Sequence, residues 1–354
     1  MKQARGMLRV AAESAYPTLT AGPRVRVAAF APFVAAHGIE LSFHSHIGDD
    51  EYRVLSGAAP RSAKAAVVGR CAVRVARRSR AADALVMVHR LLSLVPVPRR
   101  DPPSRVDVYD FDDALFHDSI STRHRAFGAL KREAERCDAH LRTAALVLAG
   151  NDYLASHARS RARRVEVVPS CVDPWSQPLR RHADVEVLAV GWLGSHSTAT
   201  YLQEVLPVFR AINRGAMRMK LVTMGAGALP AEPWLEQRPW ALEDEHAMLS
   251  SIDVGIMPLP DDPWSRGKCG YKLVQYYAAG VPAIASPVGV NSTLLRRGGG
   301  IAASTAQEWR SALEALCEDA EARRQAGLVG RRLVEADYSY QRWAPELAAM
   351  LRSI

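Results

Sequence analysis

The chain has 354 residues, of which 48% are hydrophobic and 23% are charged, as expected for a globular protein with two domains. No uncharged apolar run reaches the length of about 18 residues that a membrane span needs, and the N-terminus lacks the apolar stretch of a signal peptide. We therefore expect a cytoplasmic protein. Its five cysteines are scattered and odd in number, which argues for reduced thiols and against a disulfide framework or a zinc knuckle.

The net charge of +9 lies entirely in the first half of the chain. Residues 1–175 carry 27 Lys and Arg against 18 Asp and Glu, whereas residues 176–354 carry 19 of each kind. The cations are concentrated in residues 61–80, at a nearly helical spacing around an apolar face. This pattern is typical of a solvated surface helix, and it also suits peripheral contact with an anionic membrane face. Nucleic acid is disfavoured as a partner, because neither interleaved aromatic residues nor a recognition motif accompanies the cations.

Short apolar runs rich in Val and Leu alternate with helix-like segments, among them residues 199–214 and residues 305–327. A first set of runs predicts strands at RVRVAAF, IELSF, ALVMVH, RVDVYDF, AALVLAGN and VEVVP, and a second set predicts strands at VEVLAVGWLG, MKLVTMG, DVGIMPLP, VPAIASP and GIAAS. Runs that are apolar throughout suit parallel strands covered on both faces. The sequence therefore predicts two doubly wound α/β units that face each other across a cleft, with a seam near residues 172–184.

Charged side chains at the predicted strand ends of the first unit are candidates for ligand binding, because ligands collect beyond the carboxyl ends of parallel strands. Arg24 follows a Gly/Pro loop, and His89 ends the strand ALVMVH. The segment VYDFDDALF contributes Asp110, Asp112 and Asp113. We expect these residues to contact a ligand, but helix capping, structural ion pairs and a divalent metal are alternatives for the three carboxylates, and a plain surface role is the alternative for Arg24.

In the second unit, VLAVGWLGSHSTATYL predicts a strand, a loop of small and hydroxyl residues, and a helix with Ser197 or Thr198 as its N-cap. Small residues allow the backbone to approach a ligand, and hydroxyls hydrogen-bond phosphate oxygens; a simple capped turn is the alternative. We expect Gly225 in MGAGALP, and Trp240, to line a ligand pocket. The loop residues proposed to bind a ligand are Gly194, Ser195, His196, Ser197 and Thr198.

The segment RGKCGYKLVQYYAAGVPAIAS at residues 266–286 predicts an anion site. Gly270 and Gly280, followed by Pro282, delimit a short helix over residues 271–279 whose first amides point outward with the positive end of the helix dipole. Cations beside that end are disfavoured unless an anion binds there, as a phosphate group does. An exposed basic loop is the alternative. The residues proposed for this site are Arg266, Gly267, Lys268, Gly270, Tyr271, Lys272 and Gln275.

The segments VYDFDDALF, VLAGNDYLASHA, VVPSCVDP, VGWLGSHSTATYL and SIDVGIMPLPDDPWSRGKCGYKLVQYYAAGVPAIASPVGVN resemble, in this order, the retaining GT-B glycosyltransferases of family 4 (group 1). The similarity spans roughly residues 7–345 and is densest over residues 187–291. The resemblance implies two Rossmann-like domains, an acceptor bound mainly by the first domain and a nucleotide-sugar bound mainly by the second. It also implies retention of the anomeric configuration, with no required metal or cofactor besides the nucleotide-sugar co-substrate.

The sequence departs from the family pattern at two points. Where many members carry two glutamates separated by seven residues, this chain has Gly267 and Gln275. Where members carry Arg and Lys after the first strand of the second domain, it has Trp192 and the loop rich in Ser and Thr. Gln275 is expected to hydrogen-bond ribose hydroxyls, and the charges of Lys268, Lys272 and Arg266 are expected to replace the missing cations.

We therefore predict a retaining hexosyltransferase that uses a nucleotide-diphosphate sugar and an acceptor that is a small molecule, a glycan or lipid-linked. The expected domains are residues 1–175 for the acceptor, residues 176–335 for the donor, and residues 336–354 as a helix that crosses back to the first domain. Lys268, Lys272, Arg266 and Asp112 are the proposed catalytic residues. A sugar-nucleotide epimerase on the same fold and a non-catalytic protein that binds nucleotide-sugars or glycans remain as alternatives.

Overall fold

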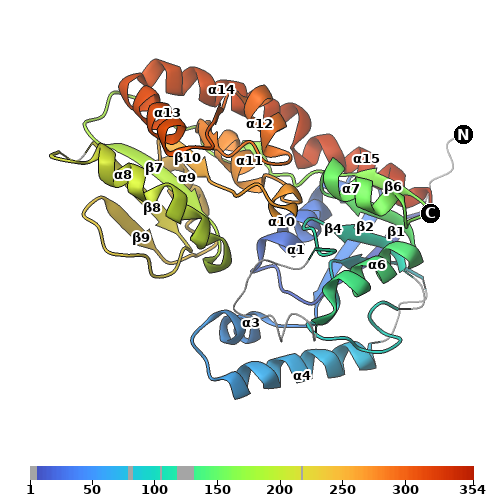
Figure 1. The fold of residues 1–354 in the computed structure, drawn as a ribbon. Coiled ribbons are helices and arrows are strands. Elements are labelled where there is room, and N and C mark those ends of the chain that lie inside the picture. The colour runs from blue at the N-terminus through green and yellow to red at the C-terminus, as the bar shows by residue number, and fades with distance from the viewer. Residues whose placement is uncertain (1–5, 79–82, 104–105, 118–130, 217) are drawn as a thin grey trace, which may run out of the picture. The chain divides into compact units, whose positions relative to one another are not determined.

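The computed structural model describes residues 6–78, 83–103, 106–117, 131–216 and 218–354. The chain divides into two compact units, shown in Figure 1: unit 1 combines Met1–Ser170 with Tyr340–Ile354, and unit 2 is Cys171–Ser339. Within the described residues, each unit contains a six-stranded sheet whose paired strands are all parallel. These two sheets with their helices confirm the predicted α/β class with two Rossmann-like units.

The sheet of unit 1 has the strand order β2-β1-β3-β4-β5-β6. Its strands are β1 (Leu8–Ser14), β2 (Ile39–Ser45), β3 (Leu85–His89), β4 (Val106–Phe111), β5 (Ala144–Ala149) and β6 (Val165–Val167). Every residue of β4 is buried, as expected for a central parallel strand covered on both faces. The polar residues at the carboxyl ends of β3 and β4 are therefore carried by a rigid part of the unit.

The helices in the described part of unit 1 are α1 (Ala21–Arg26), η1 (Ala28–Phe30), α2 (Ala31–Ala35), α3 (Asp49–Ser56), α4 (Arg61–Arg77), α6 (Glu133–Thr143), α7 (Asp152–Arg159) and α15 (Tyr340–Arg352). The last of these, α15, follows unit 2 in the chain but packs against α2 in unit 1. The Tyr340 ring lies edge-on to Phe30 and stacks on Phe33, and its hydroxyl donates a hydrogen bond of 3.2 Å to the carbonyl of Val25.

The sheet of unit 2 has the strand order β12-β11-β10-β7-β8-β9. Its strands are β7 (Leu188–Leu193), β8 (Met219–Met224), β9 (Leu235–Arg238), β10 (Val254–Met257), β11 (Ala283–Ala285) and β12 (Ile301–Ala302). Neighbouring residues of a strand enter opposite cores, because side chains alternate between the two faces of a sheet. Trp192 belongs to one buried cluster and Leu193 to the other, so β7 is buried on both sides.

The helices of unit 2 are η3 (Pro174–Ser176), η4 (His196–Glu204), α8 (Leu206–Ile212), α9 (Glu245–Ser251), α10 (Pro263–Arg266), α11 (Tyr271–Ala278), α12 (Asn291–Gly298), α13 (Ala306–Glu318) and α14 (Ala320–Asp337). α8 and α13 contribute side chains to the core on one face of the sheet, whereas α9, α11 and α12 contribute to the core on the other. None of the helices in the described part of the chain combines the length and the apolar character that crossing a membrane requires.

One strand prediction is wrong. RVRVAAF, residues 24–30, forms the end of α1 and all of η1, and the first strand is β1. The sequence grouped this run with the strands because it contains valines, but Val25 and Arg26 are buried at the end of α1, and Val27 is buried directly after it. Arg26 is buried because it pairs with a carboxylate from β4.

The sequence pattern also misses some boundaries in unit 2. β9 has the polar sequence LEQR and gives no apolar strand pattern. The helix predicted over residues 199–214 forms two elements, η4 and α8. Pro207 lies in the first turn of α8, because a proline has no amide hydrogen to donate and is tolerated there but not inside a helix. The pattern over residues 305–327 divides at Asp319, whose carboxylate accepts a hydrogen bond of 2.8 Å from the amide of Ala322 and so starts α14.

Candidate functional site

Two glycines bring the carboxyl ends of β7 and β8 into close contact in unit 2. The Gly194 amide donates to the carbonyl of Met224 at 3.0 Å. Gly225 has φ +80°, and a Cβ added to it would lie 2.2 Å from the carbonyl oxygen of Gly194 and 3.0 Å from Cβ of Trp240. A side chain therefore cannot be accommodated at position 225, and the structure places Gly194, Gly225 and Trp240 together, three of the residues that the sequence assigned to the donor.

The loop after β7 continues directly into η4, so the predicted cap position is wrong. The N-cap is Ser195, rather than Ser197 or Thr198, and its backbone is extended. The hydroxyls of Ser195 and Ser197 lie 2.8 Å apart, and the Thr198 hydroxyl donates to the Ser195 carbonyl at 3.1 Å. His196 is exposed, and its Nδ1 lies 3.2 Å from the carbonyl oxygen of Ala226, which connects this loop with the loop after β8.

The N-terminus of α11 lies beside the end of β7. Gly270 precedes the helix with φ +65°, and its carbonyl accepts from the amides of Leu273 at 2.9 Å and Val274 at 3.3 Å. Because Gly270 has no side chain, no side-chain oxygen of the N-cap residue competes for the first amides. The Lys272 ammonium nitrogen lies 5.2 Å from the centroid of a Trp192 ring. Its Cε would be 3.0 Å from a Cβ added to Gly194.

The other two predicted cations of this segment have contacts of their own. The Lys268 ammonium nitrogen lies 4.9 Å from the centroid of a Trp264 ring, and Lys268 is half-buried. Arg266 is exposed, and its Nε donates to Asp261 at 2.7 Å. Gly267 is buried and ends α10. Of the three cations, Lys272 is thus the one that contacts Trp192 near the end of β7 in the structure described here. Asp261 compensates part of the charge of Arg266.

A buried carboxylate that the sequence reasoning missed lies beside Gln275. Glu245, at the start of α9, is 9% exposed. Its Oε1 accepts a hydrogen bond of 2.9 Å from the indole nitrogen of Trp240, and its Oε2 accepts one of 3.4 Å from Nε2 of Gln275. In the sequence, Glu245 is one of three acidic residues in the run EDE, and nothing distinguishes it from its exposed neighbours.

In unit 1, the predicted residues Asp110 and His89 form a buried ionic cluster with Arg26. Asp110 is paired with Arg26, and both side chains are 1% exposed. Its Oδ2 lies 2.7 Å from Nδ1 of His89, which is fully buried. Burial raises the pKa of Asp110, but Arg26 and His89 lower it more, so that this pKa lies below its usual value. Asp110 therefore stays ionised, and both it and His89 lie in the interior of unit 1 in this structure.

Asp112 and Asp113, next along the chain, reach the surface of unit 1, with side chains that are 16% and 15% exposed. Both lie beside Arg90, which the sequence reasoning missed: its Nη2 is 2.9 Å from Asp113 and its Nε is 3.8 Å from Asp112. Burial lowers the pKa of Arg90, but Asp113 and Asp112 raise it more. Arg24, in α1, donates to the carbonyls of Thr18 at 3.2 Å and Leu19 at 3.3 Å.

The three carboxylates of VYDFDDALF thus lie beside cationic side chains of unit 1, Asp110 beside Arg26 and both Asp112 and Asp113 beside Arg90. Among the described residues, no group of His, Cys, Asp and Glu side chains is arranged to hold a metal ion.

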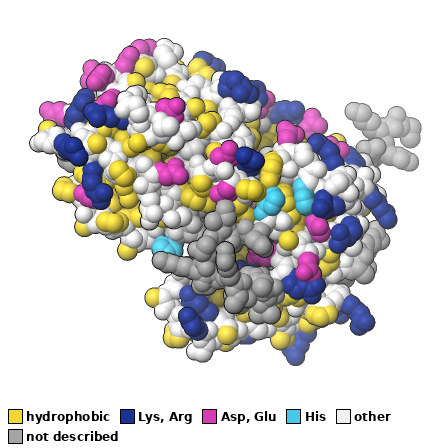
Figure 2. Space-filling view, viewed as in Figure 1, with side chains coloured by type: hydrophobic (Ala, Val, Ile, Leu, Met, Phe, Trp, Pro, Cys, Tyr) yellow, Lys and Arg dark blue, Asp and Glu magenta, His cyan; other side chains and the backbone are white. Residues whose placement is uncertain are grey.

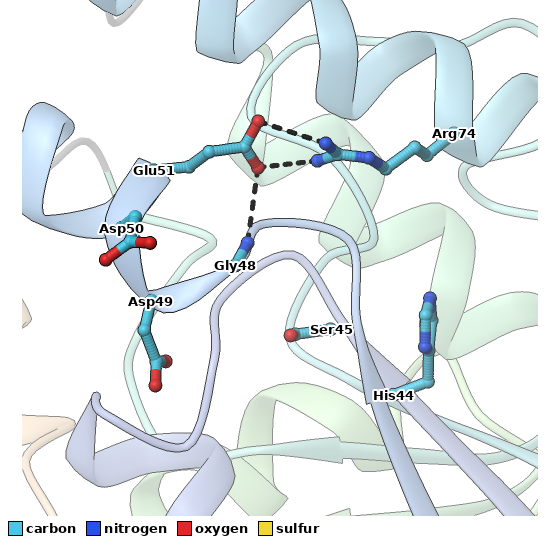
Figure 3. A pocket seen from close by; sticks show the side chains of 7 residues that line it. All are labelled: His44, Ser45, Gly48, Asp49, Asp50, Glu51 and Arg74. Carbon is cyan, nitrogen blue, oxygen red and sulfur yellow. Dashed lines mark hydrogen bonds and ion pairs between the residues drawn. The ribbon is translucent and has the colours of Figure 1, made fainter.

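A cavity of about 460 Å³ lies at the carboxyl end of β2 in unit 1 and is shown in Figure 3. Glu51 of α3 binds Arg74 of α4 on one side of it and accepts from the amide of Gly48 at 3.2 Å. These bonds, the Arg74 bond most strongly, lower the pKa of Glu51 to about 2. The cavity is lined by His44, Ser45, Gly48, Asp49, Asp50, Glu51 and Arg74.

No protein-family model matches this sequence, and no curated protein is significantly similar to it. Solved structures are similar to the chain over nearly its whole length. Sucrose-phosphate synthase from Thermosynechococcus elongatus matches with a TM-score of 0.72 at 14% identity, covering 98% of each chain. HepE of Anabaena, solved with UDP and glucose, matches with a TM-score of 0.64 at 14% identity, covering 99% of this chain and 100% of that one.

Trehalose-6-phosphate synthase OtsA, for which glycosyl transfer with retention is described, matches with a TM-score of 0.61 at 12% identity, covering 98% of this chain and 99% of that one. These neighbours are GT-B glycosyltransferases, so the chain has the GT-B fold that the sequence resemblance implied.

Proposed function

We propose that the protein is a glycosyltransferase that moves a sugar from a nucleotide-diphosphate sugar to an acceptor hydroxyl or amine, with retention of the anomeric configuration. The observation that carries the proposal is the convergence in unit 2 of Gly194, Gly225 and Trp240 with Lys272 of α11. Ligands bind at this edge of open parallel sheets, and phosphate groups bind at helix N-termini. The fold is one that glycosyltransferases with bound UDP and glucose also have.

In this proposal the diphosphate lies against the amides of Tyr271 and Lys272. The charge on the leaving diphosphate increases as the bond to the sugar breaks, and a fixed ammonium group that faces it lowers the barrier. Lys272 is held near this position by its contact with Trp192. Lys268 and Arg266 add positive charge from the segment before α11, and Gly194 to Thr198 contact the phosphates from the other side.

Nucleotide binding by two lysine variants tests the diphosphate site. The change Lys272→Ala removes a hydrogen bond to a charged group, so we expect the Kd for the bound nucleotide to rise by about 10-fold to 100-fold. Lys220→Ala is the matched control, because Lys220 is in the same unit but near the amino end of β8, and we expect no change. Calorimetric titrations with UDP, GDP, ADP and dTDP measure both effects. Equal Kd values for the two variants would contradict the diphosphate site.

The acceptor is proposed to bind unit 1 through Arg24, Asp112 and Asp113, with Asp110 and His89 supporting them from the interior. The anomeric configuration of the product, measured by NMR, tests retention. NMR of the donor sugar without an acceptor separates a transferase from an epimerase, because an epimerase changes the sugar under these conditions. A protein that binds the nucleotide-sugar but yields no product with any alcohol or amine would support the binding-protein alternative.

The outward face of α4 supports a further part of this proposal, peripheral contact with an anionic membrane. Val67, Cys71 and Val75 of α4 are buried, whereas Val73 is 48% exposed. The exposed small residues are Ala65, Ala66, Gly69 and Ala76, and the exposed cations beside them are Arg61, Arg70 and Arg77. Figure 2 shows basic and apolar side chains near each other where Figure 1 places α4. Such a face suits an interface of anionic lipids.

Sedimentation with lipid vesicles tests this contact. We expect the protein to bind vesicles of phosphatidylcholine with phosphatidylglycerol more strongly than vesicles of phosphatidylcholine alone. The double change Arg61→Gln and Arg77→Gln should weaken binding to the anionic vesicles, since each cation near such a surface contributes about 1 kcal/mol. Equal binding of the native protein to both kinds of vesicle would refute the contact.

A further inference from the structure

The segment that follows β7 is folded as a long 3₁₀-helix. η4 spans nine residues, His196–Glu204, and its hydrogen bonding starts at the amide of Thr198, which donates to the carbonyl of Ser195 at 2.9 Å. Runs of more than three or four residues are uncommon in this conformation, because its hydrogen bonds have poorer geometry than those of an α-helix. A long 3₁₀-helix often marks a segment under strain or a hinge, so η4 is a candidate for a conformational change.

Both ends of η4 are fixed, which limits the forms that the segment can take. Before it, the Gly194 amide is bonded to the carbonyl of Met224. After it, Val205 is fully buried, and Pro207 lies in the first turn of α8. Because a proline inside a helix removes a hydrogen bond and clashes with the preceding turn, η4 and α8 cannot merge into one α-helix. Any change of form is therefore confined to the residues between Gly194 and Val205.

A second form of this segment has almost the same length. Nine residues of 3₁₀-helix span about 18 Å, at about 2.0 Å per residue. Three extended residues, 196–198, followed by six residues of α-helix, 199–204, span about 19 Å. The buried residues Ala199, Leu202 and Val205 are three positions apart, and residues at this spacing share a face of an α-helix as well. The second form thus fits between the same ends and buries the same side chains.

The polar residues before position 199 favour the second form. Ser195 is the N-cap of η4 but makes no side-chain cap hydrogen bond, and its hydroxyl lies 2.8 Å from that of Ser197. The Thr198 hydroxyl donates to the Ser195 carbonyl at 3.1 Å. In an α-helix that begins at Ala199, Thr198 is the N-cap, and threonine is among the residues preferred there because its hydroxyl accepts from an amide of the first turn. One of the two cap positions that the sequence predicted therefore belongs to the second form.

We infer that residues 196–204 interconvert between η4 and a six-residue α-helix that begins at Ala199, and that a nucleotide diphosphate selects the second form. The identity of the ligand rests on the proposed function. A ligand shifts such an equilibrium only if it binds one form more tightly. The second form releases the Thr198 amide from the Ser195 carbonyl, and the hydroxyls of Ser195 and Ser197 then donate to phosphate oxygens instead of to each other.

Two variants of Ala199 test the second form without any ligand. Ala199→Pro places a proline at the first position of the α-helix, where it is tolerated, but in η4 it removes an amide that a 3₁₀-helix uses. Ala199→Val is the matched control for the added size, because Ala199 is 3% exposed. Urea denaturation measures the equilibrium constant of unfolding. We expect the two constants to agree within about 10-fold.

The exposed residue Gln203 provides the reference for a proline that fits neither form. It lies inside the helix in both, so Gln203→Pro should raise the equilibrium constant of unfolding by about 100-fold. If Ala199→Pro exceeds Ala199→Val by more than about 10-fold, an α-helix beginning at Ala199 is not accessible, and the inference is overturned.

Two variants of Thr198 test the selection by the ligand, in calorimetric titrations with UDP, GDP, ADP and dTDP. For the nucleotide that binds most tightly, Thr198→Ala should raise the Kd by about 5-fold, because losing the N-cap makes the binding form rarer. Thr198→Asn should leave the Kd within about 2-fold of the native value, since asparagine caps at least as well as threonine.

If Thr198→Asn binds as weakly as Thr198→Ala, the hydroxyl itself is what the nucleotide needs, and selection of the capped helix is overturned. An unchanged Kd in Thr198→Ala would overturn it as well. If the native protein binds none of the four nucleotides, the proposed function fails together with the ligand part of the inference. The comparison of Ala199→Pro with Ala199→Val still decides whether the two forms exist.

Discussion

Replacing Asp110 by asparagine is expected to destabilise unit 1 strongly. The change keeps the size of the side chain but removes the negative charge that faces Arg26, and both side chains of the pair are 1% exposed. Removing one partner of a buried ion pair costs about 3 to 5 kcal/mol of folding free energy, because the other charge stays in the interior without its counter-charge. Asp110→Asn also weakens the contact of 2.7 Å with Nδ1 of His89.

Native-state hydrogen exchange followed by mass spectrometry measures this loss in each unit separately. Peptides from β3 and β4 should exchange at least about 100-fold faster in Asp110→Asn, since 1.4 kcal/mol corresponds to a factor of 10. Peptides from β7 and β8 of unit 2 are the internal reference and should be unchanged. The control variant Asp50→Asn removes an exposed pair with Arg53, and we expect an effect of at most about 1 kcal/mol.

The effect of Asp110→Asn should depend on pH in one direction. The pKa of Asp110 is lowered in the folded protein, so its contribution is fully present above the unfolded-state pKa of about 4 and is lost as the pH falls through the folded-state value. The free energies of unfolding of the native protein and of Asp110→Asn should therefore approach each other below about pH 4. If the free energies of unfolding of the native protein and the variant differ by less than about 1 kcal/mol at pH 7, this account of the buried cluster is refuted. A difference that does not change with pH would refute it as well.

Further stability predictions follow from the glycines and from α3. Gly255→Ala places a Cβ 2.3 Å from the buried ring of Tyr276. The free energy of unfolding, measured by thermal denaturation, should therefore fall by about 1 to 3 kcal/mol. Gly69→Ala, with nothing within 4 Å, should instead stabilise the exposed part of α4 by about 0.5 to 1 kcal/mol, and a loss there would contradict the helix assignment. Glu51→Gln should lower the free energy of unfolding by about 1 kcal/mol at pH 7, as measured by urea denaturation. Because the pKa of Glu51 is lowered to about 2, that cost should disappear as the pH falls from about 4.5 toward 2, and a cost that is constant with pH would argue against the Arg74 pair.

The sequence predicted the fold best where glycine and proline mark the boundaries of an apolar segment. The helix expected over residues 271–279 is α11, Tyr271–Ala278, with Gly270 before it and Gly280 after it. Both glycines have positive φ, which explains why other residue types are disfavoured there. Gly194 and Gly225 were proposed from the sequence to contact a ligand, which stays a prediction; the close approach of their two loops to each other was not predicted.

Side-chain pairing across the fold was not predictable from the sequence. Arg26 and Asp110 are 84 residues apart in the chain, and a buried ion pair leaves no periodic pattern in either segment. The same holds for Glu245, whose burial depends on Trp240 and on Gln275, 30 residues further along. Residues of these types occur mostly at surfaces, so a reading of single segments assigns them to solvent.

The return of α15 to unit 1 has a consequence for how the chain folds during synthesis. All strands of the unit 2 sheet leave the ribosome before Tyr340, so unit 2 can complete its core while unit 1 still lacks the helix that covers Phe30 and Phe33. The hydrogen bond from the amide of Val172 to the carbonyl of Tyr338, 3.0 Å long, closes unit 2 where the chain enters and leaves it. Unit 2 is therefore an insertion into unit 1, and the packing of unit 1 can be completed only after Tyr340–Ile354 has been synthesised.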